Sequence, residues 1–238
     1  MQRYFISENE FTGSFIKTDF HHIKNVLRMK TDDDIIVCFN QKSFLCKIIE
    51  FTEQVVKFNK IEEIMSDNEL KIEVTLFVGF PKGDKLDLIC EKATELGVTK
   101  IKPVMMERSI VKLDERKRSE RVIRLKRICK EASEQAERSF IPEVLAIEDL
   151  KKTLFNDYDY LFFCYEREAK NNMKNYFKKI ANGSKIGVLF GPEGGISNSE
   201  YVFLKNNKFQ PISLGKRILR AETAPLAFLS MLIYEYEL

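Results

Sequence analysis

Apolar and polar residues alternate differently in the two parts of this chain. Up to about residue 63, short apolar runs separated by polar turns predict strands over 34–39, 44–49 and 55–58. An amphipathic pattern over 19–29 predicts a short helix before these strands. Closely spaced short strands of this kind are typical of a small antiparallel β-barrel.

Strands alternate with helices after the polar run 65–69, which has the composition of a linker. Apolar runs predict strands over 72–78, 101–105, 160–164, 186–190 and near 211–214. Four helices are expected: one over 84–96, one over 115–138, one between the third and fourth strands, and one at the carboxyl end. Gly97 would end the first of them. This alternation predicts an α/β domain with a mostly parallel sheet covered on both faces, and a boundary that divides the chain into 1–68 and 69–238.

The helix expected over 115–138 combines an apolar stripe with a strongly basic remainder. The stripe consists of Val122, Leu125, Ile128, Cys129, Ala132 and Ala136. The basic residues around it are Arg116, Lys117, Arg118, Arg121, Arg124, Lys126, Arg127 and Lys130. Two interpretations stay open: a face that contacts nucleic-acid phosphates, or a solvated helix surface without a partner.

Charge and cysteine content narrow the class of protein. The net charge is +3, divided into −3 for residues 1–70 and +6 for residues 71–238, which suits a polyanionic partner without requiring one. Five dispersed cysteines without a C-x-x-C pair indicate free thiols in a reducing compartment. The chain starts without an apolar signal segment, and its longest apolar run, 224–234, is too short to span a bilayer. We therefore expect a cytoplasmic protein that does not bind membranes.

Histidine is confined to His21 and His22, far in sequence from the glycine-rich loops described next. Ser-His-Asp hydrolysis or an imidazole metal site would have to be built from this one pair, so we expect neither, and no metal. We expect the reaction or binding at the glycine-rich loops to depend on arginine, lysine, glutamate, hydroxyl groups and the backbone.

Two loops near the carboxyl end carry the strongest functional signal. The glycine loop, residues 191–197, follows the strand expected over 186–190, and the arginine loop, residues 214–224, follows the last expected strand. Glycines let backbone groups approach a ligand closely, although a purely structural turn would use the same residues. Neither a G-x-G-x-x-G fingerprint nor a G-K-[ST] phosphate loop is present. The pattern predicts a ligand site at one edge of the sheet.

The arginine loop concentrates charge at the start of the terminal helix. Thr223 is predicted to cap this helix, with Pro225 in its first turn. Arg220 and Glu222 would then lie at the positive end of a helix, close to any bound anion. A mutual ion pair between Arg220 and Glu222 is the structural alternative.

With these loops the chain resembles the family of bacterial 16S ribosomal RNA uridine N3-methyltransferases (ribosomal RNA small subunit methyltransferase E) of the SPOUT superfamily. The resemblance runs nearly end to end. Besides the two loops, it includes Arg3-Tyr4-Phe5, His22, 26–30, 82–85, 92–98, Arg108-Ser109 and 134–138.

The resemblance implies a fold and a cofactor. Family members have an N-terminal PUA-like β-barrel that binds RNA and a C-terminal parallel-sheet domain with a deep trefoil knot, and they form homodimers. The loop after strand 160–164 and both loops above would hold S-adenosyl-L-methionine. The implied cofactor-binding residues are Leu189, Gly191, Pro192, Glu193, Gly194, Gly195, Leu214, Gly215, Ile218, Leu219, Arg220, Thr223 and Ala224.

The implied reaction is methylation of N3 of a specific uridine in 16S rRNA of the small ribosomal subunit. N3 must lose a proton, and an arginine can hold the resulting anion. We expect Glu222 to assist deprotonation or to orient the base. Arg217 and Arg220 would stabilise the negative charges of the uracilate and of a phosphate. Glu222 could instead be purely structural. The candidate RNA-phosphate contacts are Arg3, Arg28, Lys30 and Arg138.

Two other functions fit parts of the sequence. One is a non-catalytic RNA-binding or assembly protein, against which the presence of Arg217, Arg220 and Glu222 in a complete loop argues. The other keeps the enzyme class and changes the target to transfer RNA or a ribose hydroxyl. The resemblance of the N-terminal barrel and of residues 134–138 favours ribosomal RNA.

Overall fold

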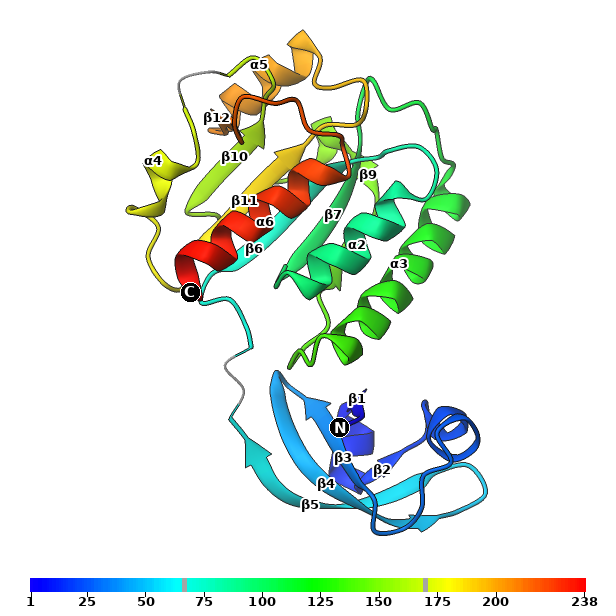
Figure 1. Cartoon of the computed structure of the whole chain (residues 1–238). Coiled ribbons are helices and arrows are strands. Elements are labelled where there is room, and N and C mark those ends of the chain that lie inside the picture. Colours follow the sequence, from blue (N-terminus) through cyan, green and yellow to red (C-terminus); the bar gives the residue numbers. More distant parts are fainter. Residues whose placement is uncertain (66–67, 169–170) are drawn as a thin grey trace. The chain divides into compact units, whose positions relative to one another are not determined.

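The computed structural model describes residues 1–65, 68–168 and 171–238 (Figure 1). The chain divides into two compact units, Met1–Glu69 with Ser133–Ile141 and Leu70–Ala132 with Pro142–Leu238. The first unit therefore includes a segment from the later part of the sequence. Ser66 and Asp67 of the expected linker lie outside the described residues.

The first unit is built on a curled five-stranded sheet. Its strands are β1 (Arg3–Phe5), β2 (Phe15–Ile16), β3 (Asp34–Phe39), β4 (Lys42–Phe51) and β5 (Val56–Ile64), in the spatial order β1-β3-β4-β5-β2. Register shifts between β4 and β5 mark irregularities of the kind that bend a sheet. Alternate residues of β3, β4 and β5, together with Tyr4, Ile16 and Ile23, form a buried core.

The sheet departs from the expected all-antiparallel pattern at β1. β1 pairs with β3 in parallel, whereas the other pairs in this sheet are antiparallel. A parallel pair needs a long crossover, and the chain between β1 and β3 provides one through α1 (Glu8–Gly13), β2 and a π-helical turn, η1 (His22–Val26). This turn is shorter than the helix expected over 19–29, and it is followed by Arg28 in the left-handed region at φ 53°.

The second unit contains the predicted parallel sheet. Its strands are β6 (Glu73–Gly79), β7 (Lys100–Met105), β8 (Glu143–Val144), β9 (Glu148–Asp149), β10 (Tyr160–Cys164), β11 (Lys185–Phe190) and β12 (Gln210–Ile212). The order is β12-β10-β11-β6-β7-β8, with β9 also paired to β7. The pairs between these strands are parallel, which confirms the sheet type. The five strands predicted in this part correspond to β6, β7, β10, β11 and β12.

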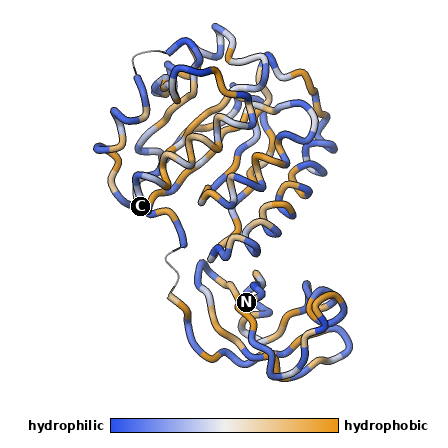
Figure 2. The backbone as a smooth tube through the Cα atoms, viewed as in Figure 1, coloured by the Kyte–Doolittle hydropathy of each residue, from blue (hydrophilic) through white to orange (hydrophobic). Residues whose placement is uncertain are grey.

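Helices cover both faces of this sheet. They are α2 (Lys85–Glu95), α3 (Glu115–Gln135), α4 (Lys174–Phe177), α5 (Asn198–Asn206) and α6 (Thr223–Tyr236), with a short 3-10 turn η2 (Leu150–Lys152). On β11, Phe190 packs against Phe228 of α6, whereas Leu189 joins a cluster with Leu204 of α5. Neighbouring residues of a strand point to opposite faces, so α5 and α6 lie on opposite sides. Figure 2 shows hydrophobic residues along the central strands between them.

Helix ends follow local backbone signals. Gly97 ends α2 with φ 82°, as predicted. α3 ends at Gln135 rather than at Arg138 because Glu137 adopts a left-handed conformation with φ 55°. Arg138 therefore lies beyond the helix. No helix in the described part of the chain is long and apolar enough to cross a membrane.

Candidate active site

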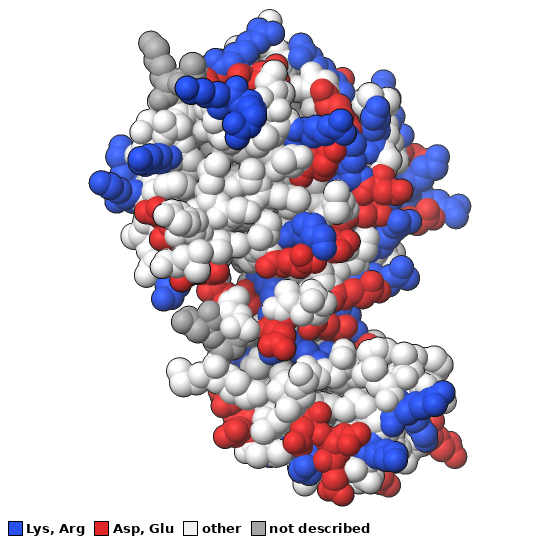
Figure 3. All heavy atoms as spheres, in the orientation of Figure 1, with Lys and Arg blue, Asp and Glu red and all other residues white. Residues whose placement is uncertain are grey.

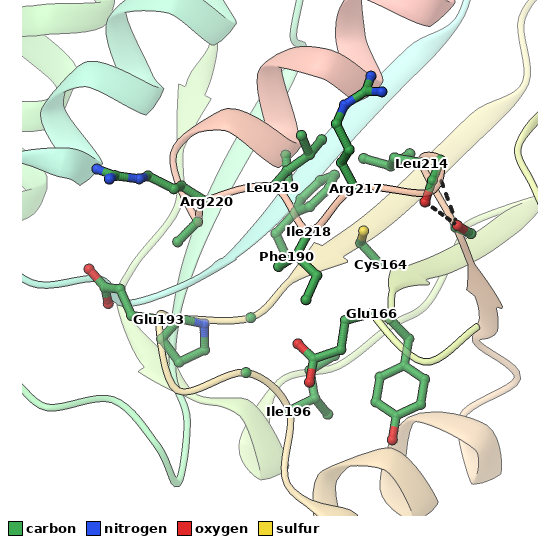
Figure 4. A pocket seen from close by; sticks show the side chains of 18 of the residues that line it. Cys164, Glu166, Phe190, Glu193, Ile196, Leu214, Arg217, Ile218, Leu219 and Arg220 are labelled. Carbon is green, nitrogen blue, oxygen red and sulfur yellow. Dashed lines mark hydrogen bonds between the residues drawn. The ribbon is translucent and has the colours of Figure 1, made fainter. Parts of the chain in front are cut away.

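A cavity of about 640 Å³ opens at the carboxyl ends of β10, β11 and β12 (Figure 4). Its wall comes from four segments: Lys82 and Lys85, before and in α2; residues 164–166, at the end of β10 and just after it; Phe190 with the glycine loop; and Ser213 with the arginine loop. The carboxyl edge of a parallel sheet is where α/β proteins bind ligands, and this volume suits a small cofactor. The structure thus brings both predicted loops together around one space.

The glycine loop needs backbone freedom and close packing. Gly195 has φ 70°, a left-handed conformation that side chains disfavour. A Cβ on Gly79, the last residue of β6, would lie 2.6 Å from Pro192 Cδ and 2.7 Å from Pro192 N. Arg108 Nη1 donates a hydrogen bond to the carbonyl oxygen of Gly194, at 2.9 Å. The loop is therefore held on one side by β6 and on the other by Arg108.

Lys85 joins the glycine loop to the arginine loop. Its Nζ lies 3.0 Å from Glu193 Oε1 and 3.1 Å from Glu222 Oε2. These two carboxylates raise the pKa of Lys85. Desolvation opposes the ionisation of Glu193, but Lys85 and the backbone N–H of Lys82 outweigh it and lower the pKa of that carboxyl. All three groups are charged at neutral pH.

The structure does not show the alternative ion pair between Arg220 and Glu222. Glu222 pairs with Lys85, and its pKa is lowered first by its own backbone N–H, with Lys85 and the positive charge of Arg220 also contributing. Arg217 and Arg220 form no ion pair with any residue that the structure describes. Both are exposed, and Figure 4 shows their guanidinium groups at the rim, pointing away from the cavity floor. They are available to an anionic group of a substrate.

Thr223 does not cap the terminal helix, contrary to the expectation. Glu222 occupies the N-cap position and makes no side-chain capping hydrogen bond. The backbone N–H groups of Thr223 and Ala224 already donate to the carbonyl oxygen of Arg220. The chain turns helically before Thr223, so this residue is the first of the helix rather than its cap. Pro225 lies in the first turn, as predicted.

The predicted cofactor-binding residues fall into two groups. Those that line the cavity are Gly191, Pro192, Glu193, Gly195, Leu214, Gly215, Ile218, Leu219, Arg220 and Ala224. Leu189, Gly194 and Thr223 lie beside it: Leu189 points to the opposite face of the sheet, and Gly194 presents its carbonyl to Arg108. Glu222 is not in the wall and reaches the cavity through Lys85.

Other residues that line the cavity were not named one by one from the sequence, although the loop after strand 160–164 and the two glycine-bearing loops were expected to hold the cofactor. They are Lys82, Lys85, Cys164, Tyr165, Glu166, Phe190, Ile196, Ser213, Lys216 and Ala221. In Figure 4 the Glu166 carboxylate and the Cys164 thiol point into the cavity. Burial and, secondarily, Glu166 raise the pKa of Cys164 to about 11, so this thiol is a weak nucleophile at neutral pH. For Tyr165 and Glu166, the position just after the strand predicted over 160–164 was the available signal.

Two of the four predicted RNA contacts are buried. Arg138 is 2% exposed and its Nη2 lies 2.6 Å from Glu69 Oε2, while Arg3 is 7% exposed. Arg3 Nη1 donates to Ser43 Oγ at 2.7 Å and to the carbonyl oxygen of Arg138 at 3.1 Å. Both guanidinium groups are therefore engaged by partners inside the first unit rather than exposed to solvent, and breaking a buried pair would leave a charge uncompensated. Arg28 and Lys30 are exposed.

The basic face of α3 is largely neutralised. Arg121 Nη2 and Arg124 Nη2 lie 2.8 and 2.6 Å from the carboxylate of Asp87 on α2. Arg116, Lys117, Arg118 and Arg127 also have acidic partners. In Figure 3 blue and red side chains are interspersed over α2 and α3. This arrangement favours a solvated, internally paired surface over a phosphate-binding face.

No metal site competes with this cavity in residues 1–65, 68–168 and 171–238, where no three His, Cys, Asp or Glu side chains are grouped to hold an ion. The five cysteines are free thiols, as the sequence indicates. The polar groups at the cavity include backbone amides, two arginines without a carboxylate partner in the described chain, Glu166 and the charged group around Lys85.

Comparison with known proteins identifies the family. A family model described as an RNA methyltransferase domain matches residues 68–233, and one described as an RNA methyltransferase PUA domain matches residues 16–54. The ribosomal RNA small subunit methyltransferase E of Bacillus subtilis (strain 168) is 38% identical over 252 aligned positions, which cover 100% of this chain and 98% of that protein. The chain belongs to the ribosomal RNA small subunit methyltransferase E family.

Other members support this assignment. Ribosomal RNA small subunit methyltransferase E 2 of Borreliella burgdorferi is 30% identical, with 99% of each chain covered. The crystal structure of the Neisseria gonorrhoeae member, bound to S-adenosyl methionine, is 29% identical with a TM-score of 0.85 and covers 99% of this chain and 98% of its own. The resemblance seen in the sequence is confirmed, as is an α/β fold with an N-terminal PUA domain. The trefoil knot and the homodimer stay predictions.

Proposed function

We propose that this chain uses S-adenosyl-L-methionine to methylate N3 of a specific uridine in 16S rRNA of the small ribosomal subunit. Membership of an RNA methyltransferase family supports the reaction class. The observation that carries the proposal is the single cavity that the glycine loop, the arginine loop and residues 164–166 form at the carboxyl edge of the sheet. A related chain of the same fold binds S-adenosyl methionine.

The cavity wall fits this cofactor. Phe190, Ile196 and Leu219 supply apolar surface for a purine. Glu166 supplies a carboxylate for hydroxyl or amino groups, and Gly191 and Gly195 of the glycine loop line the cavity without side chains of their own. When bound, the cofactor supplies an electrophilic methyl group on a positively charged sulfur.

The arginines at the rim are suited to the nucleophile. Uridine N3 reacts after it has lost its proton, and the negative charge then spreads to the neighbouring carbonyl oxygens. Arg220 and Arg217, which have no internal carboxylate partner in the described chain, can donate to these oxygens and to a flanking phosphate. We assign them to stabilising the uracilate.

Glu222 is better suited to positioning than to proton abstraction. Its pKa is lowered and its carboxylate is engaged by Lys85, which makes it a weaker proton acceptor than a free carboxylate. We propose that it fixes the start of α6, and with it Arg220, relative to the glycine loop.

The remaining assignments follow from the same proposal. Residues 1–68 would serve as the RNA-binding domain, with Arg28 and Lys30 as phosphate contacts, and residues 69–238 as the catalytic domain. The homodimer is part of the same proposal and is supported by the resemblance to the family. A protein that acts on ribosomal RNA would work in the cytoplasm.

Transfer of labelled methyl groups into 16S rRNA or small subunits tests the proposal. We expect Arg220→Ala to lower kcat/KM on the order of 100-fold, as loss of a charge-stabilising donor does, with a larger effect on turnover than on cofactor affinity. Glu222→Gln should lower both turnover and cofactor affinity. Arg116→Ala, on the exposed face of α3, is the control.

Three outcomes would count against this account. Normal turnover in Glu222→Gln would show that Glu222 has no role in the reaction. Unchanged activity in Arg220→Ala removes the anion-stabilising role. Methylation of transfer RNA in place of 16S rRNA keeps the enzyme class and replaces the target.

A further inference from the structure

One lysine contacts both loops of the cofactor cavity. Lys85 lies in the first turn of α2, Glu193 in the glycine loop after β11, and Glu222 at the N-cap of α6. The ammonium lies 3.0 Å from Glu193 Oε1 and 3.1 Å from Glu222 Oε2. Two parts of the cavity that are far apart in sequence therefore share a partner on a third element.

The two glutamates would repel each other without this lysine. Because the ion pairs measure 3.0 and 3.1 Å, the two carboxylate oxygens are no more than about 6.1 Å apart. Like charges at this separation disfavour joint ionisation, and a cation between them removes the penalty. The side chains are 26%, 22% and 16% exposed for Lys85, Glu193 and Glu222, so solvent screens them only in part.

A second contact fixes the glycine loop to the same place. The backbone N–H of Lys82 points to the Glu193 carboxylate, with nitrogen to oxygen distances of 3.3 and 3.4 Å. The amino end of a helix carries partial positive charge, which favours a carboxylate there. The start of α2 is thus an anchor for the glycine loop, and Lys85 extends that anchor to the arginine loop.

We propose that Lys85 is a positioning residue that fastens the glycine loop to the arginine loop and sets the width of the cofactor cavity. The proposal rests on the proposed function only in that the cavity binds S-adenosyl-L-methionine, and it does not depend on which nucleotide is methylated. Lys85 acts through Glu193 and Glu222.

A different role for Lys85 would be purely electrostatic. S-adenosyl-L-methionine carries one more positive charge than its demethylated product, S-adenosyl-L-homocysteine. If the ammonium acted on the cofactor by charge alone, its removal would tighten binding of the sulfonium form and leave the product unaffected. If Lys85 sets the cavity width, its removal weakens both ligands to the same degree.

Calorimetry with both ligands separates these roles in Lys85→Met, Lys85→Arg and Lys92→Met. Lys92 is a matched control, because it lies on the same helix and pairs with Glu91 and Glu95 at 2.8 Å each, outside the cavity wall. We expect Lys85→Met to weaken both ligands by on the order of 10-fold, Lys85→Arg to restore most of this loss, and Lys92→Met to match the wild type.

Hydrogen exchange of the cofactor-free protein gives a readout that needs no activity. Amides of the glycine loop and the arginine loop should exchange faster in Lys85→Met than in the wild type or Lys92→Met. Glu193→Gln should have a similar effect, and combining it with Lys85→Met should add little, because both changes break one link.

The proposal is wrong if Lys85→Met and Glu193→Gln leave both affinities and the exchange of both loops unchanged. It is also wrong if the variant binds the sulfonium form more tightly and the product unchanged. Loss of loop order in a protein that methylates some other nucleotide would refute the proposed function and leave this inference in place.

Discussion

At the scale of single residues, the contact between Gly79 and Pro192 determines where the cofactor loop lies. A Cβ at Gly79 would meet Pro192 Cδ at 2.6 Å, Met106 Sδ at 2.7 Å and Pro192 N at 2.7 Å. The proline backbone cannot give way without moving the glycine loop. The last residue of β6 is therefore a determinant of the cavity although it is not part of its wall.

Gly79→Ala should weaken S-adenosyl-L-homocysteine binding by on the order of 10-fold, because an extra methyl group in a packed contact costs about 1–3 kcal/mol and here displaces the glycine loop. Gly183→Ala is the control: Gly183 has φ 82° and open space around its Cα, so alanine there adds strain of about 1–2 kcal/mol without a clash. Calorimetry and thermal melting measure both effects. Wild-type affinity in Gly79→Ala would show that the loop adjusts freely.

The residues that could be predicted from sequence are those whose signal is local. Gly195, Arg217 and Arg220 lie in short stretches with unusual glycine and charge content, and the structure places them at the cavity. The resemblance includes residues 82–85, but the role of Lys85 could not be predicted because it depends on which loops fold next to α2. The burial of Arg3 and Arg138 could not be predicted, because residue type does not reveal burial.

At the scale of elements, Glu107 links β7 to α5 and η2. Its Oε1 accepts a hydrogen bond from Ser199 Oγ and lies 2.9 Å from Lys151 Nζ. Hydrogen bonds from Ser197 and Ser199, and the Lys151 ammonium, lower the pKa of Glu107 to about 2. The carboxylate therefore contributes to stability in its ionised form.

Glu107→Gln should be less stable than the wild type at neutral pH, and the difference should shrink in acid. Because the folded pKa is below the ordinary value of 4.5, the contribution is complete above about pH 4.5 and is lost as the pH falls to about 2. Urea unfolding at neutral pH and at about pH 3 measures it. Glu235→Gln, an exposed carboxylate of α6, is the control, and a difference that grows in acid would contradict the assignment.

Strands of the second unit were predictable because each is an apolar run of strand length bounded by polar residues. β10 matches its expected bounds, and β6, β7 and β11 differ by a residue at one or both ends. Partner choice was not predictable: the parallel pairing of β1 with β3 depends on the path of the chain between them. The π-helical form of η1 also had no sequence signal.

At the scale of the whole molecule, the family assignment and the charge distribution bear on RNA binding. Of the four candidate RNA contacts, Arg28 and Lys30 are exposed, whereas Arg3 and Arg138 are buried, and residues 1–70 carry a net charge of −3. Binding to phosphate releases counterions, so residues that bind phosphate show in the salt dependence of affinity.

The double variant Arg28→Glu with Lys30→Glu should bind 16S rRNA more weakly. The slope of log affinity against log salt concentration should fall by about 1 for each phosphate that the variant no longer binds. Lys57→Glu is the control, because Lys57 is already paired with Glu50 at 2.8 Å. Filter binding across a salt series measures the slope. A slope equal to that of the wild type would show that Arg28 and Lys30 do not bind RNA phosphates.

The identity of the methylated atom is the central claim. Mass spectrometry of nucleosides from 16S rRNA of cells that lack this gene tests it most directly. We expect N3-methyluridine to disappear and to return when the wild-type gene, but not the Arg220→Ala variant, is supplied. N3-methyluridine at an unchanged level in the deleted strain would contradict the account.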